Sequence, residues 1–289
     1  MPHTSPRRMM RRSDWDEIAA VFSLVIGFTY SDEVVEFVTD INGASYADWS
    51  WLVAVIDVVL VAATAWLKWD MTPRPKSAGP FLRRMLTGRW GLGAAIVIGL
   101  HLVLLAIPRV PGQRWAVLDS PWLTLLASGV FVGAMGLLLV SALGGGRETS
   151  SGWIVPVLIG TMVAQWSSVL WPPLIDAHDG CANDVSIDFF NAMVQVLPLF
   201  LVTLGLEVNY LRGAKTALEP GQRAVPVMTV ILLCLAEALT LSILVKADNE
   251  NCGAGAVWHE YVTFIITVHA ASIGLATLAW LLMASPGDE

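Results

Sequence analysis

Long apolar blocks separated by short polar segments dominate the chain. Each block has about the ~20 residues that an α-helix needs to cross the hydrocarbon core of a bilayer. Backbone amides inside hydrocarbon must be paired, so such blocks form helices or a closed barrel. The alternating strands of ~10 residues that a barrel requires are not seen in the sequence. The pattern predicts eight transmembrane helices, over residues 16–38, 50–68, 90–108, 121–143, 153–171, 189–211, 224–246 and 260–283.

The predicted fold class is therefore all-α, a polytopic helical bundle forming a single transmembrane domain over residues 16–283. Residues 1–15 and 284–289 are expected to be short cytoplasmic tails. The first span is the weakest, because its strictly apolar run covers only Ile18 to Tyr30 and arginines precede it, as in a signal peptide. No small-residue cleavage site follows Tyr30, so we interpret the segment as a retained helix. The connection 70–89 is expected to carry a short interfacial helix near residues 81–86.

Composition and charge agree with this interpretation and orient the bundle. Hydrophobic residues make up 55% of the chain and charged residues only 14%, against about 25% charged residues in soluble domains. With the N-terminus inside, 14 of the 17 lysines and arginines fall on the cytoplasmic side. The positive-inside rule thus predicts cytoplasmic termini and a multi-pass protein of a bacterial plasma membrane. Acidic residues gather on the outer side, either because basic residues are excluded there or because they form a cation-attracting vestibule.

Two of the three cysteines are expected to form a disulfide. Cys181 and Cys252 fall in different outer loops of the predicted topology, where an oxidising compartment allows a bridge. The alternative is two free or separately buried thiols. Cys234 lies within a predicted span, where we expect a small packing residue.

Motifs of soluble catalytic sites are incomplete. The segment Gly91–Ile96 begins like a dinucleotide-binding loop but has no preceding strand, and His259-Glu260 begins like a zinc-protease motif but has Thr263 at the second histidine position. The loops are too short for a soluble catalytic domain, so the sequence does not favour an enzyme. The basic loop 68–89 has no interleaved aromatic residues, and nucleic acid is not expected as a partner.

Polar side chains within the predicted spans are the most informative feature, because ionisable groups in a membrane are costly and commonly functional. Counted from the outer ends of their spans, six residues on six helices lie about 9–14 Å deep, at about 1.5 Å per residue. Glu207 lies apart, near the cytoplasmic end of its helix. The predicted polar layer consists of Asp57, His101, Gln165, Gln195, Glu237 and His269, with Glu33 and Glu36 at its outer entrance.

Several functions can use such a layer. We favour a small transporter or channel-like protein that moves a cation or is coupled to protons. In a second interpretation, His101, His269, Glu237 and Asp57 hold a metal, or the two histidines hold a haem. In a third, the polar groups only join helices in a scaffold or assembly subunit, alone, as a homo-oligomer or with a membrane partner. The sequence names no substrate and no cofactor.

Overall fold

All regular structure in the computed structural model is helical, as the sequence predicts. The structure describes residues 12–72, 78–106, 121–143, 151–170, 181–182, 185–213, 220–246 and 252–284, and these ranges contain no strand. The elements are α1 (Arg12–Thr29), α2 (Ser31–Ile41), α3 (Tyr46–Trp49), α4 (Trp51–Met71), α5 (Ala78–Leu86), α6 (Arg89–Ala106), α7 (Pro121–Leu143), the 3₁₀ helix η2 (Ser151–Ile154), α8 (Val155–Leu170), α9 (Ile187–Gly213), α10 (Pro220–Lys246) and α11 (Ala254–Ala284).

Five of these helices are long and apolar enough to cross a membrane, within α4, α7, α9, α10 and α11. The number rises to seven if two bent helix pairs, α1 with α2 and α5 with α6, each count as one span. The apolar part of α8, Val155–Ser167, is shorter. Helix length and composition thus support a membrane-embedded bundle, whereas the count of eight and the cytoplasmic termini stay predictions. Most of both predicted tails, and the predicted span ends at Pro108 and Trp171, lie outside the described residues.

The predicted first span is not one straight helix. Its two parts, α1 and α2, meet at 58°. Two polar features around the junction account for the bend. The Thr29 hydroxyl donates to the Val25 carbonyl oxygen at 2.7 Å, a bond that tends to bend helices. Asp32 and Glu33 then lie in the first turn of α2, where carboxylates stabilise a new helix N-terminus.

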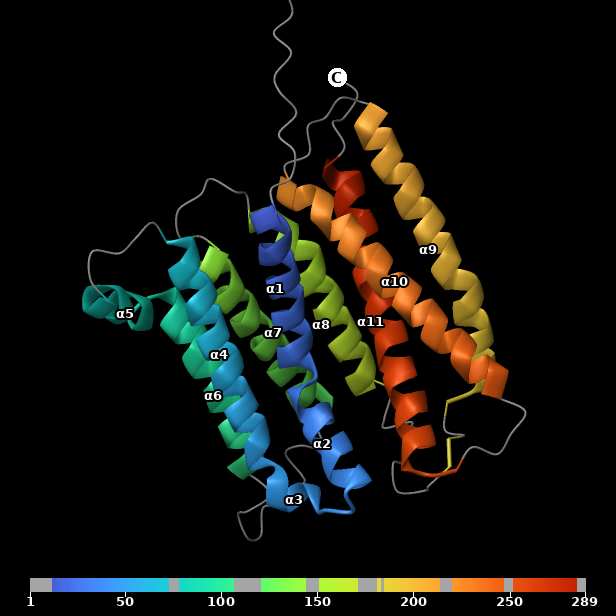
Figure 1. Ribbon diagram of the computed structural model, residues 1–289, viewed down its shortest axis with the longest axis horizontal. Helices are drawn as coiled ribbons and strands as arrows, with labels where there is room; N and C mark the ends of the chain where they lie inside the picture. The colour runs from blue at the N-terminus through green and yellow to red at the C-terminus, as the bar shows by residue number, and fades with distance from the viewer. Residues whose placement is uncertain are drawn as a thin grey trace, which may run out of the picture.

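The bundle has two packed groups with the bent pair across them (Figure 1). In one group α4, α6 and α7 pack together, and in the other α9, α10 and α11 do, while α8 joins the groups through α7 and α11. Helix α1 contacts α4, α7 and α10, and α2 contacts α4 and α11. The α1–α2 junction therefore lies where side chains from both groups can reach it. The start of α1 and the end of α11 lie at one end of the bundle, and the starts of α9 and α11 at the other (Figure 1).

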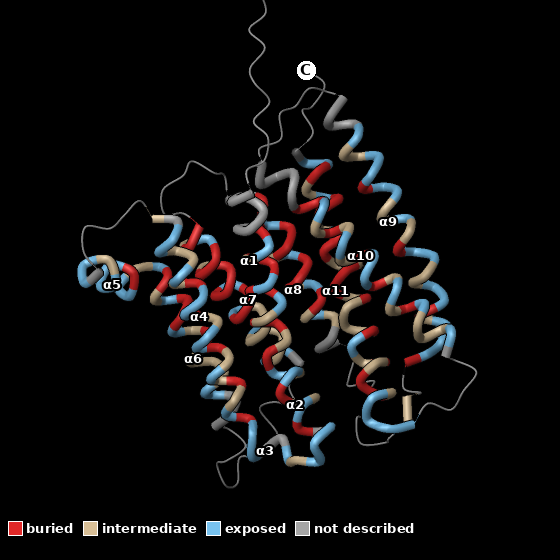
Figure 2. The backbone as a smooth tube through the Cα atoms, viewed as in Figure 1, coloured by how far each residue is buried: buried red, intermediate tan, exposed pale blue. Residues whose placement is uncertain are grey.

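Burial follows this arrangement (Figure 2), with α9 and α5 largely exposed at opposite edges. One apolar core includes Phe28, Met135 and Leu138, and a second includes Leu197 and Leu233. Within the second group, Thr229 shares a hydrogen bond with Thr277 at 3.1 Å and Thr240 with Thr267 at 3.0 Å. These buried bonds between α10 and α11 each contribute about 0.6 kcal/mol in a membrane setting.

The short helix predicted near residues 81–86 is present as α5. It meets α6 at 62°, and Met85 is buried while Arg83 and Arg84 are exposed. Phe81 packs edge-on against Trp69 with ring centroids 5.0 Å apart. One apolar face and one basic face are typical of a helix that lies along a membrane surface.

The predicted disulfide is present between Cys181 and Cys252, which are 71 residues apart. Nearby, the Val185 N–H donates to Glu260 Oε1 at 3.0 Å. The segment before α9 is thus held both to Cys252, just before α11, and to Glu260 within α11. Cys234, expected to be a packing residue, is instead exposed on α10.

Helices α8 and α11 lie very close together at Gly160. A Cβ atom there would lie 2.5 Å from the Ile273 Cα, a distance that non-bonded atoms do not tolerate. Gly160→Ala is therefore expected to force the helices apart and lower the free energy of unfolding by about 1–3 kcal/mol, the usual cost of overpacking. Chemical denaturation in detergent measures the loss. The control is Gly133→Ala on α7, where a Cβ meets nothing within 4 Å; equal effects of the two changes would contradict this packing.

Candidate polar site at a helix bend

The α1–α2 junction carries two polar residues in succession, Tyr30 and Ser31. Helical bonding continues around them, because the Tyr30 N–H donates to the Ile26 carbonyl at 3.0 Å and its own carbonyl accepts from the Val34 N–H at 3.1 Å. The bend thus turns the chain without leaving these backbone groups unpaired, as a membrane interior requires. Each of the two side chains belongs to a different polar cluster.

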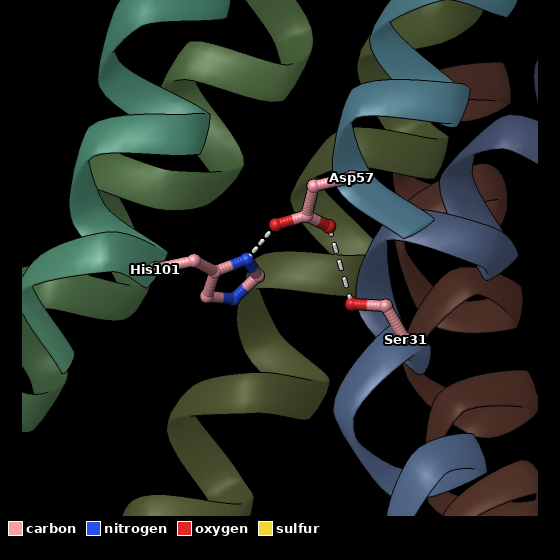
Figure 3. Close-up of polar contacts among 3 residues, drawn as sticks. All are labelled: Ser31, Asp57 and His101. Carbon is pink, nitrogen blue, oxygen red and sulfur yellow. Dashed lines mark hydrogen bonds and ion pairs between the residues drawn. The ribbon is translucent and has the colours of Figure 1, made fainter. Parts of the chain in front are cut away.

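The first cluster joins Ser31, Asp57 and His101 (Figure 3). The His101 Nδ1–H donates to Asp57 Oδ2 in a short contact, and the Ser31 hydroxyl donates to Asp57 Oδ1 at 3.3 Å. The side chain of Asp57 is fully buried and that of His101 is 16% exposed. Both carboxylate oxygens therefore have a donor, as a buried acid needs. The cluster links α4 and α6 to the bend.

The second cluster joins Tyr30, His269 and Thr161. Thr161 Oγ1 donates to the Val157 carbonyl at 2.8 Å, so it has no proton left for His269 Nε2, which lies 3.0 Å away. The His269 Nε2–H must be the donor in that bond, since a hydroxyl carries a single proton. Nδ1 then accepts from the Tyr30 hydroxyl in a short contact. These bonds assign His269 as a neutral imidazole with its proton on Nε2.

The close approach of α8 and α11 positions this second cluster. Gly160 lies against Ile273, and Thr161 and His269 are their neighbours on the facing sides of α8 and α11. His269 precedes Ile273 by four residues, so both occupy one face of α11. A larger residue at position 160 would move Thr161 away from the imidazole.

The two clusters meet at the bend. Tyr30 and Ser31 are consecutive, and adjacent Cα atoms are about 3.8 Å apart. Through them, two histidines and one aspartate from α4, α6 and α11 converge on one point of the chain. This convergence of buried ionisable groups is the main feature of the described structure.

A cavity of about 280 Å³ lies beside the bend, between the α1–α2 pair, α10 and α11. Tyr30, Glu33, Tyr261 and His269 are polar residues among otherwise apolar lining side chains. Glu33 Oε2 is buried and has no hydrogen-bond partner in the part of the chain that the structure describes. A buried carboxylate oxygen without a donor is uncommon in folded proteins.

The other predicted site residues are placed differently. Glu36 is half-buried on α2 and Gln165 is half-buried on α8, while Gln195 is exposed on the outer helix α9. Glu237 is half-buried on α10 and has no hydrogen bond to either cluster within the described residues. The structure therefore brings Asp57, His101 and His269 to the bend but leaves the three other members of the predicted layer outside these hydrogen-bonded groups.

Sequence reasoning missed Tyr30, Ser31 and Thr161 as site residues. Tyr30 and Ser31 stand where the first strictly apolar run ends, so they resembled the end of a span. Their position at a bend depends on how α1 and α2 pack against α4 and α11. Thr161 is a single hydroxyl in an apolar helix, and such residues commonly bond their own backbone, as this one also does.

The metal and haem interpretations gain no support from these contacts. No group of three or more histidine, cysteine, aspartate or glutamate side chains is close enough to hold a metal within the described ranges. Both ring nitrogens of His269 already bond protein hydroxyls, and His101 Nδ1 bonds Asp57.

No protein-family model, no curated protein and no solved structure matches the chain. The chemistry of the site is then the basis for assigning a function.

Proposed function

We propose that the protein is a small membrane transporter or channel-like protein that moves a cation or is coupled to protons. The observation that carries this proposal is the convergence of Asp57, His101 and His269 on the Tyr30–Ser31 bend. Asp57, paired with His101, is the central exchanging group. Glu33, in the neighbouring cavity, is the second acid of the pathway.

The free-energy cost of placing these ionisable side chains in a membrane supports a functional role for them. An ionisable residue near the middle of a membrane helix costs about 2.5–3.5 kcal/mol on insertion scales, and residues of this kind commonly mark ion or proton paths. Helix packing alone does not require such groups, since threonine pairs already join α10 to α11. Aspartate and histidine side chains in direct contact are of the kind that form proton relays in membrane pumps and transporters.

The bend supports the same assignment. Discontinuous membrane helices recur at transporter binding sites. Here the backbone bonds continue through the bend, and what the bend presents is side chains: it places Glu33 in the first turn of α2 and Ser31 on the Asp57 carboxylate.

The test is proton uptake into proteoliposomes driven by an imposed potential. Asp57→Asn keeps the size of the side chain and the bond from Ser31, but it removes the group that exchanges a proton. We expect uptake to fall to the level of protein-free liposomes. A pH-sensitive dye trapped inside the vesicles measures the rate.

The matched control is Glu207→Gln, a half-buried acid on the outer helix α9. It removes one carboxylate from a helix that carries no residue of either cluster, and uptake is expected to match that of the unmodified protein. Asp57→Asn vesicles that take up protons at the unmodified rate would rule the proposal out. A scaffold or assembly subunit would give no protein-dependent uptake in either case.

A further inference from the structure

Helix α9 lies at an edge of the bundle and has a largely uncovered outer face (Figure 2). It packs against α10 and α11, and of the five long candidate spans in the described chain it is the least buried. Leu197 and Leu204 fix its inner side, because both are buried in the second apolar core. The opposite side of α9 is left to the membrane.

Gln195 lies at the middle of this outer face. Nine residues separate it from Leu204, and at about 3.6 residues per turn this spacing places the two side chains on opposite sides of the helix. Gln195 follows Ile187, where α9 begins, by eight residues, or about 12 Å at about 1.5 Å per residue. The side chain therefore lies well inside a hydrocarbon core of about 30 Å.

An amide at that depth is unfavourable when it faces lipid. Gln195 is exposed, and its amide has no hydrogen bond to any of the residues that the structure describes. Acyl chains offer no donor or acceptor, whereas a neighbouring membrane helix can. Thr203 is also exposed on α9, but its hydroxyl donates to the Leu199 carbonyl at 2.7 Å and so is satisfied within the helix. Gln195 alone of the two needs a partner from outside.

A second copy of the chain is the partner that fits this amide. Two copies insert into a membrane in the same direction, because the same lysines and arginines orient both. When they pair along α9 about a two-fold axis, the two helices run parallel and each residue meets its equivalent at the same depth. A carboxamide carries both donors and an acceptor, so two glutamines can bond each other reciprocally.

The residues around Gln195 suit a close pair of helices. Exposed positions recur along this face at alternating spacings of three and four, as in the seam between two helices that cross at about 20°. Within the span they are Ala192, Gln195, Leu199, Val202 and Leu206. One polar position in an apolar seam is a known means of fixing register and the number of chains. Asp188 continues the series but lies in the first turn of α9, where water and salt screen the repulsion between two copies.

We infer that α9 mediates a two-fold symmetric homodimer in the membrane, in which the Gln195 amides of the two copies bond each other across the seam. The inference goes beyond the proposed function and does not depend on it. No residue of either polar cluster lies on α9, so the interface and the proton exchange can fail separately.

Single-molecule photobleaching tests the inference, because it counts the copies in each particle of labelled full-length protein in lipid bilayers. Gln195→Leu is expected to raise the protein-to-lipid ratio at which half of the protein is dimeric by about five- to thirtyfold, the effect of an interhelical hydrogen bond between polar side chains. Gln195→Asn keeps a self-complementary amide and is expected to stay closer to the unmodified protein. Thr203→Val is the control and is expected to change nothing, since its hydroxyl is satisfied within α9.

Cysteine cross-linking locates the interface, in a background that carries Cys234→Ser. Leu199→Cys lies one turn from Gln195 on the same face, and oxidation of membranes with copper phenanthroline is expected to give disulfide-linked dimers. Val58→Cys is the control, because Val58 is also exposed but lies on α4 in the other packed group.

Three results would overturn the inference. The first is an unmodified protein that is monomeric at every protein-to-lipid ratio. The second is equal dissociation of the unmodified protein and Gln195→Leu. The third is a Leu199→Cys variant that cross-links to its own copy no better than Val58→Cys, or that cross-links only to a different protein.

Discussion

Replacing His101 by leucine is expected to destabilise the protein by about 3 kcal/mol or more, because it leaves the carboxylate of Asp57 buried without its imidazole partner. Asp57 is fully buried, and its remaining donor in the cluster is the Ser31 hydroxyl at 3.3 Å. A hydroxyl at that distance cannot replace a charge-assisted bond. Equilibrium unfolding in mixed detergent micelles, followed by circular dichroism, measures the change.

The double variant Asp57→Val with His101→Leu is the matched comparison. Removing both members of a buried pair leaves no charge to desolvate, and such replacements are often neutral or stabilising. We expect the double variant to recover most of the stability that His101→Leu loses. If the double variant is as unstable as the sum of its single changes, the two residues are not an energetically coupled pair.

The second large effect concerns His269. Thr161→Val keeps the shape of the side chain but removes the acceptor for the His269 Nε2–H, and Tyr30→Phe removes the donor to Nδ1. Each change is expected to lower the free energy of unfolding by about 1–3 kcal/mol, the cost of a buried polar group without a partner. The double variant should lose less than the sum, because both bonds act on one imidazole.

The tautomer gives this prediction a direct readout. Nitrogen-15 NMR of histidine-labelled protein should show His269 protonated at Nε2 in the unmodified chain. In Thr161→Val the preference for that tautomer should weaken, whereas Thr161→Ser, which keeps the hydroxyl, should preserve it. A spectrum with the proton on Nδ1 in the unmodified protein would contradict the bonding to Thr161 and Tyr30.

The helical architecture could be predicted from the sequence because hydrocarbon imposes it locally. A block of apolar residues must satisfy its own backbone, so its length alone predicts a helix, and the bounds of α7 agree with the predicted 121–143. The cysteine pair could also be predicted, since topology assigned both thiols to the same side. The bend within the first span could not, because it depends on the hydroxyl of Thr29 and on packing by α4 and α11.

The site was only partly predictable for a geometric reason. Counting residues along a span gives the depth of a side chain but not the direction in which it points around the helix. Asp57 and His101, at equal predicted depth, are in contact. Gln195 was assigned a similar depth, yet it is exposed on α9, whose packing partners are α10 and α11. Which faces meet depends on contacts between distant segments, and a single sequence does not encode these in its periodicity.

The most direct test of the proposed role of the bend is proton uptake by proteoliposomes that contain the double variant Asp57→Val with His101→Leu. This variant is expected to fold with near-normal stability, so its activity reports the chemistry of the pair rather than the integrity of the bundle. We predict that it takes up protons no faster than protein-free liposomes, while Glu207→Gln vesicles match the unmodified protein. Uptake by the double variant at the unmodified rate would contradict the account.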